Sequence, residues 1–280
     1  MDKLSGRFFA PHKRVAQFIL IYLTGLAALI CYKHARGLSD YVIPGVPALI
    51  ATGREMFLLY IVETLDTLSI AVLGHGLSIV IASLVAILGR LHNWMGATIK
   101  TTAYNVQAFP IVAIAPIIFI LVGDGMLSRL IIGALICYFP LLLAFLGILT
   151  EPVPEVEHFF VITGRYNWRL EIKVRAFENI NKIVTVVVGT ATLAMVGTIV
   201  AEFIAADKGV GYMIRLALYQ SDMANILVSL FVIGLCSSLY FSLLEGLTSW
   251  FASRIMGGTF SPLKNIRRHH DDHHRTTTKM

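Results

Sequence analysis

The stretch LIIGALICYFPLLLAFLGIL, residues 130–149, decides the class of protein to which this chain belongs. It carries no charged side chain, and at about 1.5 Å per residue its helix would be about 30 Å long, the thickness of the hydrocarbon core of a bilayer. The whole 280-residue chain shares this character, with 56% hydrophobic residues, 14% charged residues and a mean hydropathy of +0.75. Soluble domains have roughly 45–50% apolar residues. The composition therefore indicates a membrane protein.

Six apolar runs of this kind predict six transmembrane helices. They lie at approximately 15–31, 67–88, 102–122, 130–149, 183–206 and 224–244. The runs lack the strict alternation over about ten residues that barrel strands show, so we expect an all-α membrane protein. The second run begins near Met56, but Glu63 and Asp66 are costly at membrane depth. We therefore expect residues 54–66 to form an interfacial amphipathic segment.

The positive charges predict the orientation of the chain, because Lys and Arg are retained on the cytoplasmic side of a membrane. With the N-terminus inside, 17 of the 23 Lys and Arg residues fall in cytoplasmic segments, so both termini are expected in the cytoplasm. The N-terminal apolar run lacks a convincing small-x-small cleavage site, which favours a retained signal anchor over a cleaved signal peptide. The net charge of +6 is then a topology signal, with attraction to the lipid bilayer, and requires no nucleic-acid partner.

The loop at residues 150–182 is the largest one expected in the cytoplasm. Pro152 ends the fourth span, since proline lacks the helical N–H and restricts the residue before it. The pattern then predicts two short helices, at residues 155–163 and 167–179, separated by Gly164.

The second of these helices has the composition of a docking surface. Arg165, Arg169 and Lys173 recur every four residues on one side, and Trp168 and Ile172 form a second stripe. A tryptophan flanked by arginines at helical spacing is typical of an interface anchor. We expect this helix to bind a cytoplasmic partner; the alternative is a stop-transfer loop whose cations bind lipid headgroups.

The order and spacing of several short motifs resemble one known family. They are IPGVP at 43–47, ETLDTLSIAV at 63–72, FPIVAIAPIIFILVGDG at 109–125, YFPLLLAFLGI at 138–148 and GTIVAEFIAADKGVGYMI at 197–214. Together, from about residue 41 to 246, they resemble the membrane permease subunits of bacterial ABC importers. The branch they are similar to handles nitrate, sulfonates, taurine, bicarbonate and thiamine or riboflavin precursors. The resemblance implies a type I importer bundle of six helices in the bacterial inner membrane.

The resemblance also implies the partners of the chain. They are a second permease subunit, identical or different, a separate ABC ATPase, and an extracytoplasmic binding protein that selects the solute. ATP hydrolysis would belong to the ATPase, so the chain itself is not expected to be an enzyme or to hold a cofactor. The family further implies a coupling helix that sits in a cleft of the ATPase, and the residues assigned to it here are Gly164, Arg165, Trp168, Arg169, Ile172 and Lys173.

The coupling segment departs from the motif of that family. With Gly164 aligned, His158, Phe159 and Phe160 stand where Glu-Ala-Ala is expected, and Val174, Ala176 and Phe177 stand where Ile, Leu and Pro are expected. Only the glycine and the β-branched Val174 survive. The departure indicates a divergent branch or one half of a heterodimeric pair.

Three residues within the spans are candidates for the transport pathway. His75 lies between two glycines well inside the second span, where a neutral, hydrogen-bonded packing residue is favoured over a substrate ligand. Pro110 and Pro116 lie in the third span. They either unwind it locally to line a pathway or only kink it.

Three further residues near the outer end of the fifth span are candidates for a gate. Glu202 either snorkels to water, or it braces the outer gate or pairs with Lys208 or Arg215. Gly209 and Gly211 allow a tight reversal of the chain and a close approach of a partner backbone.

Several motifs are absent from the sequence, which removes other functions. It has no G-x-x-x-x-G-K-[ST], no H-E-x-x-H and no G-x-S-x-G, so we expect neither ATP hydrolysis nor an intramembrane hydrolase. Its acidic residues lie near span ends rather than at the midplane that ion coupling requires, which disfavours a secondary carrier. A secondary carrier and a membrane scaffold remain as alternatives.

No metal site is expected from the cysteines or the histidines. The three cysteines are scattered over separate spans, and RRHHDDHHR at 267–275 belongs to a polar, low-complexity tail. The organisation expected is therefore an N-terminal part at 1–56, a core permease domain at 57–251 and a disordered basic tail at 252–280.

Overall fold

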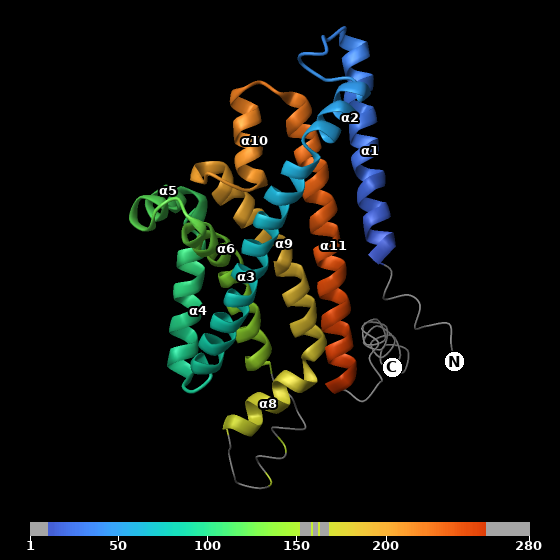
Figure 1. Cartoon of the computed structure of the whole chain (residues 1–280). Coiled ribbons are helices and arrows are strands. Elements are labelled where there is room, and N and C mark those ends of the chain that lie inside the picture. Colours follow the sequence, from blue (N-terminus) through green and yellow to red (C-terminus); the bar gives the residue numbers. More distant parts are fainter. Residues whose placement is uncertain (1–10, 152–157, 159–161, 163–167, 256–280) are drawn as a thin grey trace, which may run out of the picture.

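A computed structural model describes residues 11–151, 158, 162 and 168–255, and these residues form helices and the turns between them, with no strand (Figure 1). The helices are α1 (Pro11–Arg36), α2 (Val46–Glu55), α3 (Phe57–Gly89), α4 (Asn93–Gln107), α5 (Ile111–Val122), α6 (Met126–Thr150), α8 (Trp168–Glu178), α9 (Ile180–Ala205), α10 (Val210–Tyr219) and α11 (Met223–Ile255). Five of them, α1, α3, α6, α9 and α11, are long and apolar enough to cross a membrane. The all-helical membrane class is thereby confirmed.

The third of the six expected spans, at 102–122, is a bent pair of helices. Helices α4 and α5 meet at an angle of 88°, and Figure 1 shows α5 turned away from the direction of α4. The apolar run at 102–122 therefore contains a sharp bend, next to the first of the two prolines that were expected to unwind or kink it. The helix stops before Pro110, which has an extended backbone and lacks the N–H that a continuing helix needs. Pro116, in contrast, lies inside α5.

Helix α3 also differs from its prediction. It is one helix of 33 residues that begins at Phe57 and passes through Glu63 and Asp66, so residues 54–66 are not a separate interfacial segment. The reason is that both carboxylates have partners inside the protein: Glu63 accepts a hydrogen bond from the Gly209 N–H, and Asp66 pairs with Arg129. A charge that is paired within the bundle loses much of its cost at membrane depth.

The centre of the bundle is formed by α3, α6 and α9, which cross at close range over small residues. A Cβ atom on Gly74 of α3 would lie 3.3 Å from the backbone nitrogen of Ala134 in α6, and one on Gly197 of α9 would lie 3.2 Å from the Cα of Gly133. Small residues permit such close contact between membrane helices. Towards the α8 end, buried side chains such as Leu141 and Phe145 fill the core.

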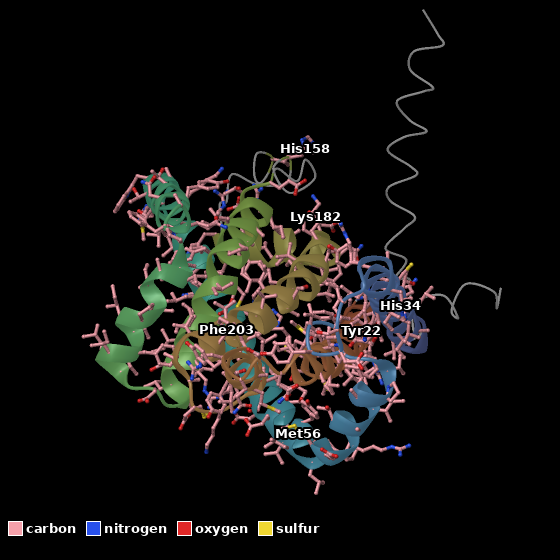
Figure 2. All side chains as sticks on the ribbon, turned by 90° about the horizontal axis from the view of Figure 1, so that it is seen from above. Tyr22, His34, Met56, His158, Lys182 and Phe203 are labelled. Atoms are coloured by element: carbon pink, nitrogen blue, oxygen red, sulfur yellow. The ribbon has the colours of Figure 1, made fainter. Side chains whose placement is uncertain are left out.

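Helix α1 packs at the edge of the bundle against α11, as the view from above shows (Figure 2). Phe18 and Tyr22 contact Phe231 with ring centroids 6.0 and 4.9 Å apart, and Tyr22 donates a hydrogen bond to the Leu227 carbonyl. A Cβ on Gly234 would lie 2.2 Å from the Phe18 ring, so any larger residue would have to displace that ring. Helices α8 and α10 lie at opposite ends of the bundle (Figure 1).

Candidate functional site

Helix α8 occupies the segment where a docking helix was expected, and its two sides have different environments. Ile172 is buried and belongs to the core cluster that also contains Ile148, Leu149 and Val187. On the other side Trp168 and Lys173 are exposed, as are Arg169, Leu170 and Phe177. Trp168 and Ile172 therefore do not form one stripe, because Ile172 faces the bundle and Trp168 is exposed. Gly164, Arg165 and the expected helix at 155–163 lie outside the described residues.

Buried ion pairs fasten α8 to the bundle. Glu171 accepts hydrogen bonds from Arg90, at 2.7 Å, and from Nε of Arg175, at 3.0 Å. Arg90 directly follows the last residue of α3, and Arg175 also donates to the backbone carbonyl of Glu151 at the end of α6. The side chains of Glu171 and Arg175 are 5% and 4% exposed. Because an unpaired buried charge is costly, these contacts define one position of α8 against α3 and α6.

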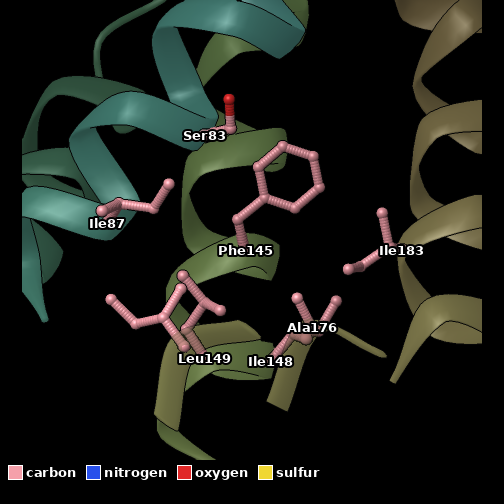
Figure 3. A pocket seen from close by; sticks show the side chains of 8 residues that line it. Ser83, Ile87, Phe145, Ile148, Leu149, Ala176 and Ile183 are labelled. Atoms are coloured by element: carbon pink, nitrogen blue, oxygen red, sulfur yellow. The ribbon is translucent and has the colours of Figure 1, made fainter. Parts of the chain in front are cut away.

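An apolar cavity lies directly behind α8. Its volume is about 130 Å³, and its walls come from α3, α6, α8 and α9 through residues such as Ile87, Phe145, Ala176 and Ile183 (Figure 3). Close-packed interiors contain few voids of this size. The seat of α8 thus combines a fixed polar contact at Glu171 with unfilled space beside Ala176.

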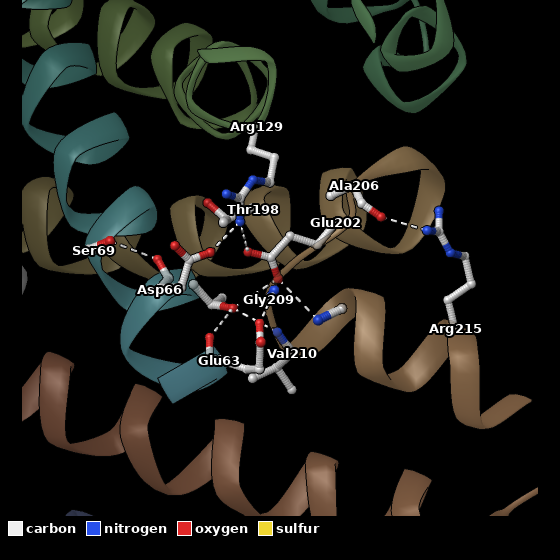
Figure 4. Close-up of polar contacts among 12 residues, drawn as sticks. Glu63, Asp66, Ser69, Arg129, Thr198, Glu202, Ala206, Gly209, Val210 and Arg215 are labelled. Atoms are coloured by element: carbon white, nitrogen blue, oxygen red, sulfur yellow. Dashed lines mark hydrogen bonds and ion pairs between the residues drawn. The ribbon is translucent and has the colours of Figure 1, made fainter. Parts of the chain in front are cut away.

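At the opposite end, side chains from α3 and α9 cap the first turn of α10. The backbone N–H of Gly209 donates to Glu63 at 2.5 Å, that of Val210 to the Thr67 hydroxyl at 2.9 Å, and that of Gly211 to Glu202 at 3.0 Å (Figure 4). The first N–H groups of a helix have no partner within the helix, and carboxylates are stabilising at its positive end. Here other helices provide those partners.

Both glycines of this turn are required by its geometry. Gly209 has φ +94°, and a Cβ there would lie 2.2 Å from the carboxylate carbon of Glu202. A Cβ on Gly211 would lie 2.3 Å from the carbonyl oxygen of Ile199. The close approach expected from the Gly209 and Gly211 pair therefore takes place, and its partner is the C-terminal part of α9.

Arg129 connects the carboxylates of this cluster at the α10 end of the bundle. This residue of α6 is 3% exposed, pairs with Asp66 of α3, and lies 3.4 Å from the carboxylate of Glu202, which is fully buried (Figure 4). Glu202 also lies 2.9 Å from the Thr67 hydroxyl. Four helices, α3, α6, α9 and α10, thus meet at one hydrogen-bonded cluster.

The expectations for Glu202 need correction. A fully buried carboxylate does not snorkel to water, and the cation that pairs with it is Arg129 rather than Lys208 or Arg215. Arg215 instead donates to the carbonyl oxygen of Ala206 at 2.5 Å. The sequence reasoning missed Arg129 because its partners lie 63 and 73 positions away along the chain.

His75 lies in a closed polar contact between three helices. It is 1% exposed, its Nδ1 lies 2.9 Å from the Tyr240 hydroxyl of α11, and its Nε2 lies 3.1 Å from the Thr190 hydroxyl of α9. Thr190 in turn lies 2.9 Å from the carbonyl oxygen of Val186, to which it can donate. A neutral imidazole with one donor and one acceptor satisfies this arrangement. Both ring nitrogens of the buried His75 thus lie within hydrogen-bonding distance of hydroxyl groups from neighbouring helices.

The residues that the structure describes contain no group of three or more His, Cys, Asp or Glu side chains that could hold a metal ion. The two ionic clusters, one around Glu171 and one around Arg129, consist of ion pairs and helix caps. Such groups fix helices relative to one another.

The structure is thus a bundle of apolar helices with the short helix α8 at one end and the capped helix α10 at the other (Figure 1). The chain belongs to the family of binding-protein-dependent transport system inner membrane components, which it matches over residues 55–257. It is therefore an ABC-type transport permease with the type I permease fold, and a multi-pass protein of the inner membrane. This confirms the family resemblance seen in the sequence.

The chain is also similar to individual permeases of this family. The chain is 24% identical over 181 residues to the formylaminopyrimidine transport permease protein ThiX of Halalkalibacterium halodurans, which covers 65% of this chain and 72% of that protein. It is 30% identical over 143 residues to the riboflavin transport system permease protein RibX of Chloroflexus aurantiacus, covering 51% and 53%. It is 31% identical over 144 residues to a probable ABC transporter permease protein of Haemophilus influenzae, covering 49% and 56%. The matched regions span about half of the length of the last two relatives.

Proposed function

We propose that this permease forms the translocation pathway of an ATP-driven importer and is coupled to a separate ATPase through α8. The observation that carries the proposal is the two-sided environment of α8. Its inner side is fastened by Glu171 and Arg175, while its outer side offers Trp168, Arg169 and Lys173. The Arg169 guanidinium lies 5.3 Å from the centre of the Trp168 ring. A rigid helix with an aromatic and arginine surface is suited to a protein cleft.

Coupling then needs no catalytic group in this chain. When the ATPase pair closes on ATP, a helix held in its cleft moves with it and carries the attached ends of α3 and α6. The energy available for coupling is bounded by the difference in docking energy between the two states. The buried pairs at Glu171 serve to transmit the motion, and residues such as Trp168 to receive it.

The proposal is tested by co-purification in mild detergent from a native host. The Trp168→Ala, Arg169→Ala double variant is compared with the Trp250→Ala, Arg254→Ala double variant. This control removes a similar Trp–Arg contact, with Arg254 5.7 Å from the Trp250 ring centre, from the end of α11. We expect an ATPase subunit to co-elute with the wild type and the control but not with the α8 variant. Absence of any ATPase from wild-type preparations after crosslinking would refute the importer.

We also propose that α4 faces a second permease subunit across the pathway. Its exposed surface carries polar side chains at Thr101, Thr102, Tyr104, Asn105 and Gln107. Polar side chains are unfavourable against lipid and typically face a bundle interior or a water-filled cavity. The partner, identical or different, would cover this surface.

Cysteine crosslinking distinguishes this surface from one that faces lipid. The background variant is Cys31→Ser, which removes an exposed native cysteine. In it, Asn105→Cys is compared with Ile21→Cys on α1, where Ile21 is 71% exposed. We expect a crosslinked permease pair only with Asn105→Cys. Equal crosslinking at both positions would contradict the assignment.

The solute that we propose is a small nitrogen heterocycle delivered by an extracytoplasmic binding protein. The support is that two relatives are named for formylaminopyrimidine and riboflavin transport. Uptake of a labelled pyrimidine and of riboflavin, compared with labelled nitrate and taurine, tests the class. Uptake of the anions alone would reject it.

A further inference from the structure

A second cavity, distinct from the apolar one behind α8, lies between the ends of α3, α4 and α6. It has a volume of about 180 Å³ and is lined by Arg90, Lys100, Gly89, Gly96, Gly147 and Thr150. Arg90 places it at the α8 end of the bundle, because the same guanidinium pairs with Glu171. The function proposed above does not use this pocket.

Glycines explain why the pocket exists. A Cβ on Gly96 would lie 2.8 Å from the carbonyl oxygen of Gly89, so the start of α4 lies directly against the end of α3. Gly147 on α6 has no atom within 4 Å of the place of its missing Cβ. No side chain therefore fills the space in front of Gly147, and the pocket stays open there.

The pocket holds more positive charge than the described residues balance, because Arg90 shares the single carboxylate of Glu171 with Arg175. Nε of Arg90 is buried and has no hydrogen-bond partner among them, although the other end of the guanidinium binds Glu171. Lys100 is exposed and forms no ion pair within the described part of the chain. Buried donors are rarely left unpaired, and an arginine and a lysine that line one pocket favour an oxyanion with several acceptor oxygens. A phosphate group has this chemistry.

The surroundings of the pocket indicate where the phosphate comes from. Trp94, in the first turn of α4, is 69% exposed, and Leu88 and Leu91 are 50% and 37% exposed beside Gly89 and Arg90. Exposed tryptophan is typical of the headgroup level of a bilayer, and exposed leucines next to it favour acyl chains. Basic pockets between membrane helices bind anionic headgroups.

We infer that Arg90 and Lys100 form a binding site for the phosphate group of an anionic phospholipid. The lipid completes the donors of Arg90 while Glu171 keeps its ion pair, so it supports the junction of α3 and α4 beside the seat of α8. The lipid class is defined by its headgroup charge, and phosphatidylglycerol serves as the probe.

Native mass spectrometry of the full chain, released from nanodiscs of phosphatidylcholine with increasing phosphatidylglycerol, measures the lipid that stays bound. Lys100→Gln removes one charge of the pocket, and Lys208→Gln is the matched control, an exposed lysine just before α10 at the other end of the bundle. A basic residue near an anionic surface contributes roughly 1 kcal/mol, which is about fivefold in affinity. We expect Lys100→Gln to lower retention of phosphatidylglycerol about fivefold and Lys208→Gln to leave it unchanged.

Gly147→Leu fills the pocket without changing its charge, and leucine suits the interior of α6 better than glycine. We expect this variant to lose the bound lipid while its thermal stability in phosphatidylcholine is retained. Wild-type retention by both Lys100→Gln and Gly147→Leu would overturn the site. If inorganic phosphate in lipid-free detergent raised the thermal stability of the protein as much as phosphatidylglycerol does, the assignment to a lipid would be overturned. These outcomes do not depend on the presence of an ATPase, so they are independent of the proposed coupling.

Discussion

The substitution Glu171→Gln should detach α8 from the bundle. Glu171 is 3% exposed and is the carboxylate that Arg90 and Arg175 share, at 2.7 and 2.8 Å. Breaking a buried ion pair costs about 3–5 kcal/mol because a charge is left behind. The Arg90 side chain is 20% exposed and regains part of its hydration, so we expect a loss of about 2–3 kcal/mol. At about 1.4 kcal/mol per factor of ten, the seated population of α8 falls relative to the detached one by roughly 30- to 140-fold.

Hydrogen exchange on the purified chain in detergent measures this loss directly. The amides of residues 172–178 should exchange roughly 30 to 140 times faster in Glu171→Gln, while those of α6 and α9 keep their protection. Glu178→Gln is the control, since Glu178 is an exposed carboxylate in the same helix. Arg90→Gln should have a smaller effect because Glu171 keeps Arg175. Equal exchange in the Glu171 and Glu178 variants, or a loss of protection over the whole bundle, would refute the reasoning.

Three further predictions concern the packing of the bundle. Gly211→Ala places a Cβ 2.3 Å from the Ile199 carbonyl and should lower stability by about 1–3 kcal/mol, whereas Gly189→Ala enters open space and should leave stability equal or higher, as thermal unfolding in detergent can measure. Ala176→Leu should fill the cavity behind α8, raise the unfolding temperature and slow solute uptake in vesicles; faster uptake would contradict a role for that space. His75→Phe should cost about 1–2 kcal/mol, because two hydroxyls lose their partner, and should leave the KM for the solute unchanged; a raised KM would instead indicate a ligand.

The sequence predicted the all-helical membrane class because that class depends on composition and on the lengths of the apolar runs alone. The run at 130–149 became the central part of α6, and the stretch from Trp168 became α8. Local chemistry also predicted that Pro110 interrupts a span. It could not predict that the interruption is a bend of 88°, since that angle depends on how α5 packs against α6 and α9.

The two clusters could be predicted only in part. The pair Glu171 and Arg175 has the spacing of an intrahelical ion pair and is visible in the sequence. Arg90 and Arg129, which complete the two clusters, are isolated cations whose partners are distant in the chain. From the sequence alone, the charge of Asp66 is expected to be unfavourable at membrane depth. Only the folded bundle shows that Arg129 pairs with this charge.

Helix α3 connects the two clusters. Glu63 and Thr67 near its start bind the first turn of α10, and Arg90, directly after its end, binds Glu171 of α8. The 27 positions between Glu63 and Arg90 correspond to about 40 Å of helix. If α8 tilts this helix by about 5° about the end that contacts α8, the end that contacts α10 moves by about 3.5 Å, which exceeds the length of a hydrogen bond. Either the bonds to Gly209 and Val210 break or α10 travels with α3. The membrane-spanning rod thus converts a small rotation at one surface into a displacement at the other.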